Sequence, residues 1–147
     1  MGEQSASWAT SEGTRRSMLA NRGRDTGPEL SVRRLLHAQG LRYRVNTPPV
    51  KGLRRSADIV FTRARLAVFI DGCFWHGCAE HYQRPGRNQT YWDAKVQANQ
   101  ARDRNTDEVL ASHGWTVLRI WEHDVRADPV EVGARIREVY ERISSSR

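Results

Sequence analysis

The 147-residue sequence predicts an α/β domain built on a mixed central β-sheet flanked by helices. Two observations carry this prediction. Short apolar runs rich in β-branched residues alternate with longer polar stretches that have helix-starting and helix-ending signals. The chain has the length of one ordinary domain, and we find no internal repeat or linker. We therefore expect a single domain over residues 14–147, preceded by a flexible segment over residues 1–13.

Each main predicted helix has a boundary signal in the sequence. Two starts read as an N-cap residue followed three positions later by Glu, and two ends are followed by Gly. A short basic helix or arm is also expected close to the N-terminus. The predicted helical segments are residues 14–24, Thr26 to Gly40, 89–112 and Asp128 to about Ser144.

Four apolar or alternating runs predict the strands of the sheet. They are Leu41–Val45, Ala57–Phe61, Leu66–Ile70 and Trp115–Trp121. A short Arg-rich turn between the second and third strands predicts a hairpin. The element order α-β-β-β-α-β-α then gives a mixed sheet with helices packed against it.

Positive charge is concentrated in the first half of the chain. Between Thr14 and Arg65 there are 13 Lys and Arg residues and three acids, which leaves +10 in a chain whose total is +7. Nearly all of these bases are Arg, whose fork geometry matches phosphate. The asymmetry indicates a polyanion partner such as nucleic acid.

Composition also restricts the compartment. No apolar run approaches membrane-spanning length, and no signal peptide with an apolar core is present. We expect a cytoplasmic, nucleoid-associated protein without a membrane partner. Two cysteines in a reducing compartment favour metal binding or free thiols over a disulfide.

Both cysteines lie in the segment DGCFWHGCAEH, residues 71–81. Cys73, Cys78 and His81 supply three thiolate and imidazole ligands of the kind that Zn²⁺ prefers. Such a zinc ion would stabilise an irregular loop that has little core of its own. The alternative is a pair of buried thiols with surface histidines nearby.

A closed tetrahedral zinc site needs a fourth ligand. The candidates are His76, His113 and His123. We favour His123, because it follows the strand 115–121, whose end is expected beside the end of the strand 66–70. His76 is then free to act as a general base. From spacing alone, His76 as the fourth ligand or as a group beside the ligands remains an alternative.

Asp58 is an acid inside an apolar strand. A buried carboxylate is costly unless it binds a cation or hydrogen-bond donors. Together with Asp71 at the end of the next strand, it predicts a Mg²⁺ site at the edge of the sheet. The alternatives are a strand-start cap or an ion pair with Arg54 or Arg55 for Asp58, and a turn residue for Asp71. Glu29 is explained by the capping box, with an active-site role as its alternative.

The chain resembles the very short patch repair (Vsr) endonuclease family from about Thr14 to His123. The segments that carry the resemblance are TRRSMLANRGRDTGPELSVRRLLHAQGLRYRV, ADIVF, VFIDGCFWHGCAEH, YWDAKVQANQARDR and GWTVLRIWEH. The resemblance implies a restriction-endonuclease-like core of the PD-(D/E)xK type. It also implies an enzyme that nicks one strand 5′ to the thymine of a T:G mismatch, with catalytic Mg²⁺ and a structural zinc.

The resemblance also implies residue roles. Asp58 binds Mg²⁺ together with the backbone carbonyl of Ile70, His76 is the general base or its equivalent, and Glu29 and Asp71 support the site. The zinc ligands are Cys73, Cys78, His81 and His123. Three positions depart from the family pattern: Asp71 and His123 replace a His and a Cys, and a His-rich run is absent after His76.

The same resemblance assigns residues to DNA. Met18 lies in an arm that reaches the mismatch from the minor groove, and Phe74, Trp75 and Trp92 wedge into the duplex. A rigid aromatic wedge can open a base step and replace the lost stacking. Core packing is the alternative for these aromatic residues. On the long helix, Lys95, Asn99 and Arg102 share one face that suits phosphate or base contacts, or else a solvated surface.

These observations predict a Mg²⁺-dependent DNA endonuclease that acts on duplexes with T:G mismatches in very short patch repair. A restriction or defence endonuclease on the same core is the first alternative. A non-catalytic, zinc-stapled DNA-binding protein and a hydrolase with catalytic zinc are further alternatives. One site and one cut strand suggest a monomer, and recruitment by a mismatch-repair protein stays open.

Overall fold

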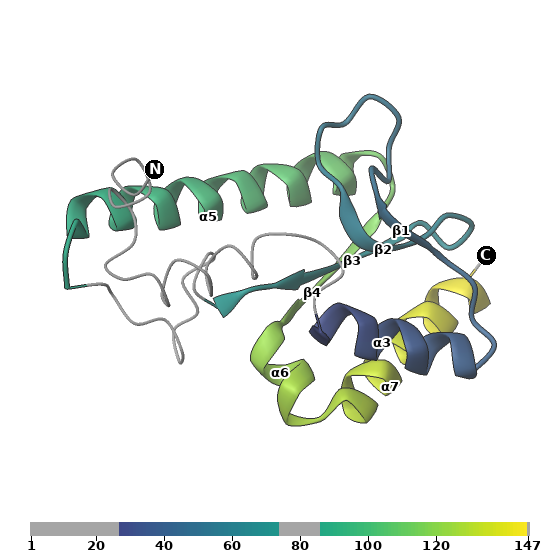
Figure 1. The fold of residues 1–147 in the computed structure, drawn as a ribbon. Helices are drawn as coiled ribbons and strands as arrows, with labels where there is room; N and C mark the ends of the chain where they lie inside the picture. Colours follow the sequence, from purple (N-terminus) through teal and green to yellow (C-terminus); the bar gives the residue numbers. More distant parts are fainter. Residues whose placement is uncertain (1–26, 74–85, 147) are drawn as a thin grey trace.

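The computed structural model describes residues 27–73 and 86–146. Figure 1 shows its elements, which in chain order are α3 (Gly27–Ala38), β1 (Arg44–Thr47), β2 (Ala57–Phe61), β3 (Leu66–Asp71), α5 (Gln89–Ser112), β4 (Thr116–Trp121), α6 (Glu122–Ala127) and α7 (Pro129–Ser145). The N-terminal segments predicted at 1–13 and 14–24 lie outside the described residues. In the described part, no helix is long and apolar enough to cross a membrane.

The four strands form one mixed sheet in the order β1-β2-β3-β4. β2 pairs antiparallel with β1 and β3, whereas β3 and β4 run parallel, with Asp71 beside Trp121. The sheet therefore has two different ends. At the end that we call the acidic end, β2 begins and β3 and β4 finish. At the hairpin end, the turn of residues 62–65 joins β2 to β3.

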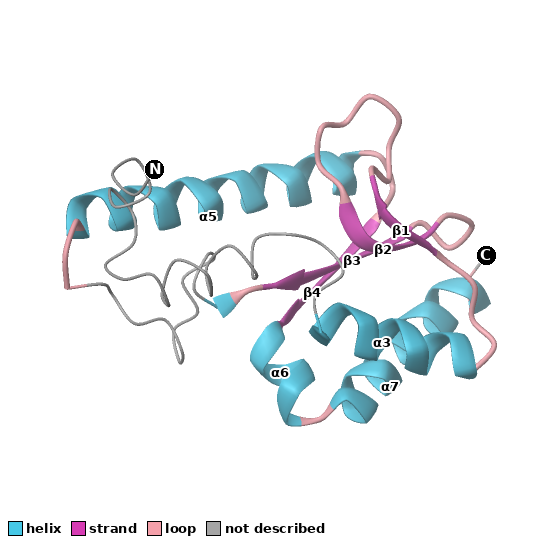
Figure 2. Cartoon of the chain, viewed as in Figure 1, coloured by secondary structure: helices cyan, strands magenta, loops and turns pink. Residues whose placement is uncertain are grey.

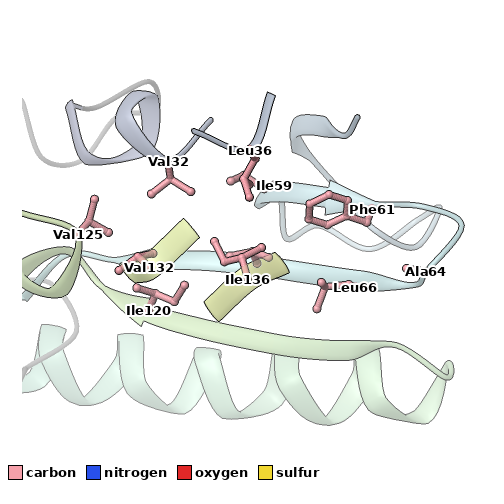
Figure 3. Close-up of a cluster of buried hydrophobic side chains, with 11 residues drawn as sticks. Val32, Leu36, Ile59, Phe61, Ala64, Leu66, Ile120, Val125, Val132 and Ile136 are labelled. Carbon is pink, nitrogen blue, oxygen red and sulfur yellow. The ribbon is translucent and has the colours of Figure 1, made fainter. Parts of the chain in front are cut away.

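Helices cover both faces of the sheet. Figure 2 shows α3, α6 and α7 on one face and the long α5 along the other. The main core lies between the sheet and the helices α3, α6 and α7, as Figure 3 shows. Its buried members are Val32, Leu36, Ile59, Phe61, Ala64, Leu66, Val68, Ile120, Val125, Val132 and Ile136. Burying a Val, Leu, Ile or Phe side chain contributes about 1.5–3 kcal/mol. With both faces covered, β2 and β3 are almost wholly apolar, and a charge within them requires an explanation.

The predicted helix boundaries are confirmed at three points. Gly40 and Gly114 have φ angles of +88° and +81°, which glycine adopts without steric cost. The residue after each of these glycines donates its N–H to a carbonyl five positions back, at 3.1 and 3.0 Å, which closes a Schellman motif. At the start of α7, the Asp128 side chain accepts the Glu131 N–H at 3.1 Å, as the capping signature predicted.

The first strand differs from its prediction. It was predicted over residues 41–45, and it begins at Arg44 and ends at Thr47. The N–H of Leu41 is used to close the end of α3, and the Tyr43 hydroxyl donates to the Arg33 carbonyl at 2.7 Å. The chain is therefore held against α3 before it becomes available for strand pairing.

The short helix α6 was not predicted from the sequence. It follows β4 without a loop and begins at Glu122. Its buried residue Val125 is part of the main core, and this packing favours a helix directly after β4. As a result, His123 lies on a helix at the acidic end of the sheet.

Candidate functional site

Asp58 is the carboxylate around which the acidic end is built. Its Oδ2 accepts the backbone N–H of Ile70 from the neighbouring strand at 2.6 Å. Burial, together with the nearby carboxyl groups of Glu29 and Asp71, raises the pKa of Asp58 to about 7, and the Ile70 hydrogen bond acts in the opposite direction. Asp58 is thus a carboxyl group whose charge is poorly balanced by the protein itself.

Glu29 brings a second carboxyl group to Asp58 from the first turn of α3. Its exposed fraction is only 3%, and a side-chain hydrogen bond joins it to Asp58. Two carboxyl groups can form such a bond only when one of them holds a proton. Arg33 lies one turn further along the helix, with Nη2 at 3.2 Å from Glu29 Oε2. Glu29 therefore lies at the site, which a capping role by itself does not require.

Asp71 is held by Arg119 from the parallel strand β4. Arg119 Nη1 donates to both Asp71 carboxylate oxygens, at 3.0 and 3.1 Å, and its Nε donates to both oxygens of Asp107 on α5, at 2.9 and 3.1 Å. The guanidinium also lies over the Phe69 ring, 4.3 Å from its centroid. Burial opposes the charge of Arg119, but Asp107, Asp71 and Asp103 keep its pKa above the ordinary value.

This ion-pair network changes the interpretation of Asp71. The sequence offered a metal-binding carboxylate or a turn residue, and in the structure Asp71 forms a buried ion pair that ties the end of β3 to α5. Arg119 was missed in the sequence analysis. The available signal was the one used for Asp58, namely a charge inside an apolar strand.

The residues at the acidic end fit a divalent cation. Asp58 and Glu29 lie within hydrogen-bond reach of each other, and among the described residues Asp58 makes no ion pair with Arg54 or Arg55. A hard cation favours oxygen ligands of this kind and would offset the burial and the neighbouring carboxyl groups that raise the pKa of Asp58. The Ile70 backbone, proposed as a second ligand, is adjacent to Asp58 through its N–H.

A second polar site, next to the acidic one, joins Cys73 to α6. Cys73 Sγ lies 3.1 Å from His123 Nδ1, although the two residues are fifty positions apart in sequence. The Cys73 N–H donates to Glu122 Oε1 at 3.1 Å, which fixes the backbone where β3 ends. His113, the competing candidate, lies beyond the far end of β4, exposed, with Nδ1 2.9 Å from the Val109 carbonyl. Two of the four predicted zinc ligands are therefore neighbours.

The contacts of His123 favour the tautomer of its imidazole ring that carries the proton on Nε2. Its Nε2 lies 3.3 Å from Asp124 Oδ1, and the ring stacks on Trp121 with a 6.4 Å centroid separation. When Nε2–H donates to Asp124, Nδ1 presents its lone pair toward the Cys73 sulfur. A carboxylate behind the imidazole is the usual support of a histidine that binds zinc. The described residues contain no complete cluster of three metal-binding side chains.

Several predicted site residues lie outside the described residues. They are Met18, Phe74, Trp75, His76, Cys78 and His81. Of the remaining ones, Trp92 is 1% exposed and packs edge-on against Tyr91 at 5.0 Å, an environment that matches helix packing, its predicted alternative. On α5, Lys95 and Arg102 are exposed, and Arg102 Nη1 donates to Asn99 Oδ1 at 3.3 Å.

Sequence comparison places these features in a family. The family model described as DNA mismatch endonuclease Vsr matches residues 8–83. This chain belongs to the DNA mismatch endonuclease Vsr family. It is 44% identical over 120 residues to the type II nicking enzyme V.NaeI of Lentzea aerocolonigenes, covering 80% of this chain and 72% of that enzyme. It is 34% identical over 112 residues to the DNA mismatch endonuclease Vsr of Escherichia coli, covering 76% of this chain and 70% of that enzyme.

A solved structure supports the fold. The catalytic domain of the homing endonuclease I-Bth0305I aligns with a TM-score of 0.54 and 20% identity, over 81% of this chain and 98% of that domain. The Vsr-family chain is a DNA endonuclease, and its family implies a divalent metal ion. The predicted mixed α/β architecture and the predicted family are confirmed.

Proposed function

We propose that this Vsr-family endonuclease nicks one strand of duplex DNA 5′ to the thymine of a T:G mismatch, as a step of very short patch repair. The observation that carries the proposal is the meeting of the half-buried Asp58 with the buried Glu29, with the pKa of Asp58 raised to about 7. Withdrawing the Asp58 charge from water costs free energy that a bound cation would offset. We further propose a restriction-endonuclease-like core, a monomer, and action on nucleoid DNA in the cytoplasm.

The carboxyl groups have separate roles in this proposal. Asp58 and the Ile70 carbonyl would hold Mg²⁺, which when bound would polarise the scissile phosphate and lower the pKa of a water molecule. Glu29, hydrogen-bonded to Asp58, orients that carboxylate. Asp71, paired with Arg119, holds the end of β3 in place. His76, five positions further along the chain, accepts the proton of the attacking water.

The proposed zinc site uses Cys73, Cys78, His81 and His123. Cys73 Sγ and His123 Nδ1 lie 3.1 Å apart, and these two atoms would hold the ion from the described part of the chain. The role is structural: it fixes the segment that carries Phe74, Trp75 and His76 between its ligands.

Recognition of the mismatch is proposed for the aromatic residues of that segment and for Met18 in the N-terminal arm. Phe74 and Trp75 would enter the base stack, and Lys95, Asn99 and Arg102 would contact the duplex from α5. Trp92 is buried in the free protein, and its stacking on bases would require it to leave that environment.

A strand-specific nicking assay tests this function. Duplexes labelled on either strand and containing T:G, other mispairs or A:T are incubated with the enzyme, with and without Mg²⁺. We expect cleavage 5′ to the mismatched thymine that depends on Mg²⁺. Equal cleavage of the fully paired duplex would support the restriction-type alternative. No cleavage, with DNA binding retained, would support a non-catalytic DNA-binding protein.

A further inference from the structure

The exposed charge of the first half of the domain has a single sign. Between residues 27 and 65, all of the exposed charged residues are Lys or Arg. The two acids of this stretch, Glu29 and Asp58, lie in the site at the acidic end and are not exposed. Such a surface repels itself and attracts polyanions. The proposed catalytic site with its carboxyl groups does not explain why this surface is basic.

Four of these arginines gather near the hairpin end without an acidic partner. Within the described residues, Arg34, Arg42, Arg44 and Arg63 form no ion pair. On α7, by contrast, arginines face glutamates one turn away: Arg137 Nε lies 2.9 Å from Glu141 Oε2, and Arg142 Nη2 lies 3.8 Å from Glu138 Oε1. The α7 arginines balance charge within one helix, whereas the four near the hairpin are exposed without an acidic partner, although Arg42 Nη1 donates to the His37 and Leu41 carbonyls at 3.3 and 3.0 Å.

The unpaired arginines border a hollow of about 500 Å³. We call it the basic hollow; Arg42, Arg44 and Arg63 line it, together with the rings of Tyr43, Phe61 and Tyr140. The rings pack on one another, with centroid separations of 6.0 Å between Tyr43 and Phe61 and 4.9 Å between Phe61 and Tyr140. Packed aromatic rings therefore form the floor of the hollow, and the three arginines lie around it.

We propose that the basic hollow, with Arg34 beside it, is a second DNA-contacting surface that holds duplex phosphates at a distance from the cleaved linkage. The chain belongs to a family of DNA endonucleases, and guanidinium groups without acidic partners match phosphates in charge and geometry. The strand β2 separates the two surfaces: Asp58 lies near its start and Arg63 just past its end. The five residues of β2 span roughly 17 Å, which is the length of about five base pairs of duplex DNA.

A contact of this kind adds affinity without reading sequence, because phosphates carry no direct sequence information. It predicts an effect on DNA binding and none on the chemical step. This proposal requires DNA as the ligand and is independent of the T:G specificity proposed above.

The test compares two double variants with the same change in net charge. Arg44→Gln/Arg63→Gln alters the basic hollow, and Arg137→Gln/Arg142→Gln alters the glutamate-paired arginines of α7. Binding of a matched duplex of 30 base pairs is measured without divalent metal between 50 and 300 mM salt. For the hollow variant we expect affinity at 100 mM salt to fall roughly 10-fold or more, with a log–log salt slope shallower by about 2. The α7 variant should stay close to wild type, and the single-turnover nicking rate at saturating enzyme should be unchanged in both.

Two outcomes would overturn the proposal. One is an unchanged affinity and salt slope in the hollow variant, or an equal loss in both variants. The other is unchanged DNA binding together with lost binding of poly-glutamate, which would assign the surface to an acidic protein. Because the binding assay uses matched DNA and no Mg²⁺, a failure of mismatch nicking in the wild type leaves its outcome interpretable.

Discussion

The charged side chains at the two ends of the sheet differ in burial and in pairing. At the acidic end, Glu29 and Asp71 are buried and Asp58 is half-buried, and each has hydrogen-bonded neighbours. At the hairpin end, Arg42, Arg44 and Arg63 are exposed and lack acidic partners in the described part of the chain.

The difference follows from the cost of burial. A charge in water is inexpensive and available for binding, whereas a buried charge must be paired, protonated or bound to a cation. The end with buried charges is therefore where we place chemistry, and the end with exposed charges is where we place non-specific binding.

Among the substitutions that test the difference between the two ends, replacing Asp58 should have the largest effect, which is on the nicking rate. Asp58→Asn keeps the size of the side chain and removes the charge that would hold Mg²⁺. We expect single-turnover nicking of a T:G duplex to fall by about 1000-fold or more, with binding of the duplex retained. The exposed Glu138→Gln on α7 is the matched control and should nick normally. Nicking retained in Asp58→Asn would remove the proposed metal site from this end.

Two of the three candidate histidines, His113 and His123, lie at opposite ends of β4 and provide a direct comparison. His123→Ala should lose bound zinc, because it removes the ligand beside Cys73, whereas His123→Cys should keep it, since thiolate is an equally suitable ligand. His113→Ala, at the hairpin end, should retain zinc. Metal content by mass spectrometry and thermal unfolding measure the outcome. Equal zinc content in all three variants would contradict the proposed site.

Arg119 and Arg63 compare a buried and an exposed guanidinium. Arg119→Met leaves the buried Asp71 carboxylate without its partner, and we expect the free energy of unfolding to fall by about 3 kcal/mol. Adding Asp71→Asn should restore part of this loss, since the unpaired charge is removed. Arg63→Met should change stability by less than about 0.5 kcal/mol. Chemical denaturation measures all four proteins, and equal effects of Arg119→Met and Arg63→Met would refute a structural role for the network.

The raised pKa of Asp58 makes stability depend on pH. Burial raises the pKa of Asp58 from 3.8 to about 7, so the folded protein holds a proton that the unfolded chain has released. Without metal, the free energy of unfolding should therefore fall as pH rises from about 4 to about 7, by roughly 3 kcal/mol. Asp58→Asn should flatten this fall, and Mg²⁺ should stabilise the wild type above pH 7. A wild-type stability curve identical to that of Asp58→Asn over this range would show that Asp58 ionises normally.

Local patterns in the sequence predicted much of the fold. The hairpin of β2 and β3, the bounds of α5 and the caps at Gly40, Gly114 and Asp128 depend on signals within a few residues, and they are confirmed. The start of β1 and the helix α6 were not predicted. Both depend on packing against α3 and the main core, to which neighbours in sequence contribute little.

By itself, the sequence determined which residue types are present for chemistry and that one buried strand carries an acid. Residue types suggested the Mg²⁺ site at Asp58 and the zinc ligands, His123 among them, and the family resemblance implied the same roles and added the Ile70 carbonyl. Only the tertiary structure decided that Glu29 lies against Asp58 and that Arg119 holds Asp71 from 48 positions away, and it brings His123 beside Cys73. The reason is strand direction: β3 and β4 run parallel, so segments far apart in the chain finish at the same edge of the sheet, whereas His113 remains at the other edge.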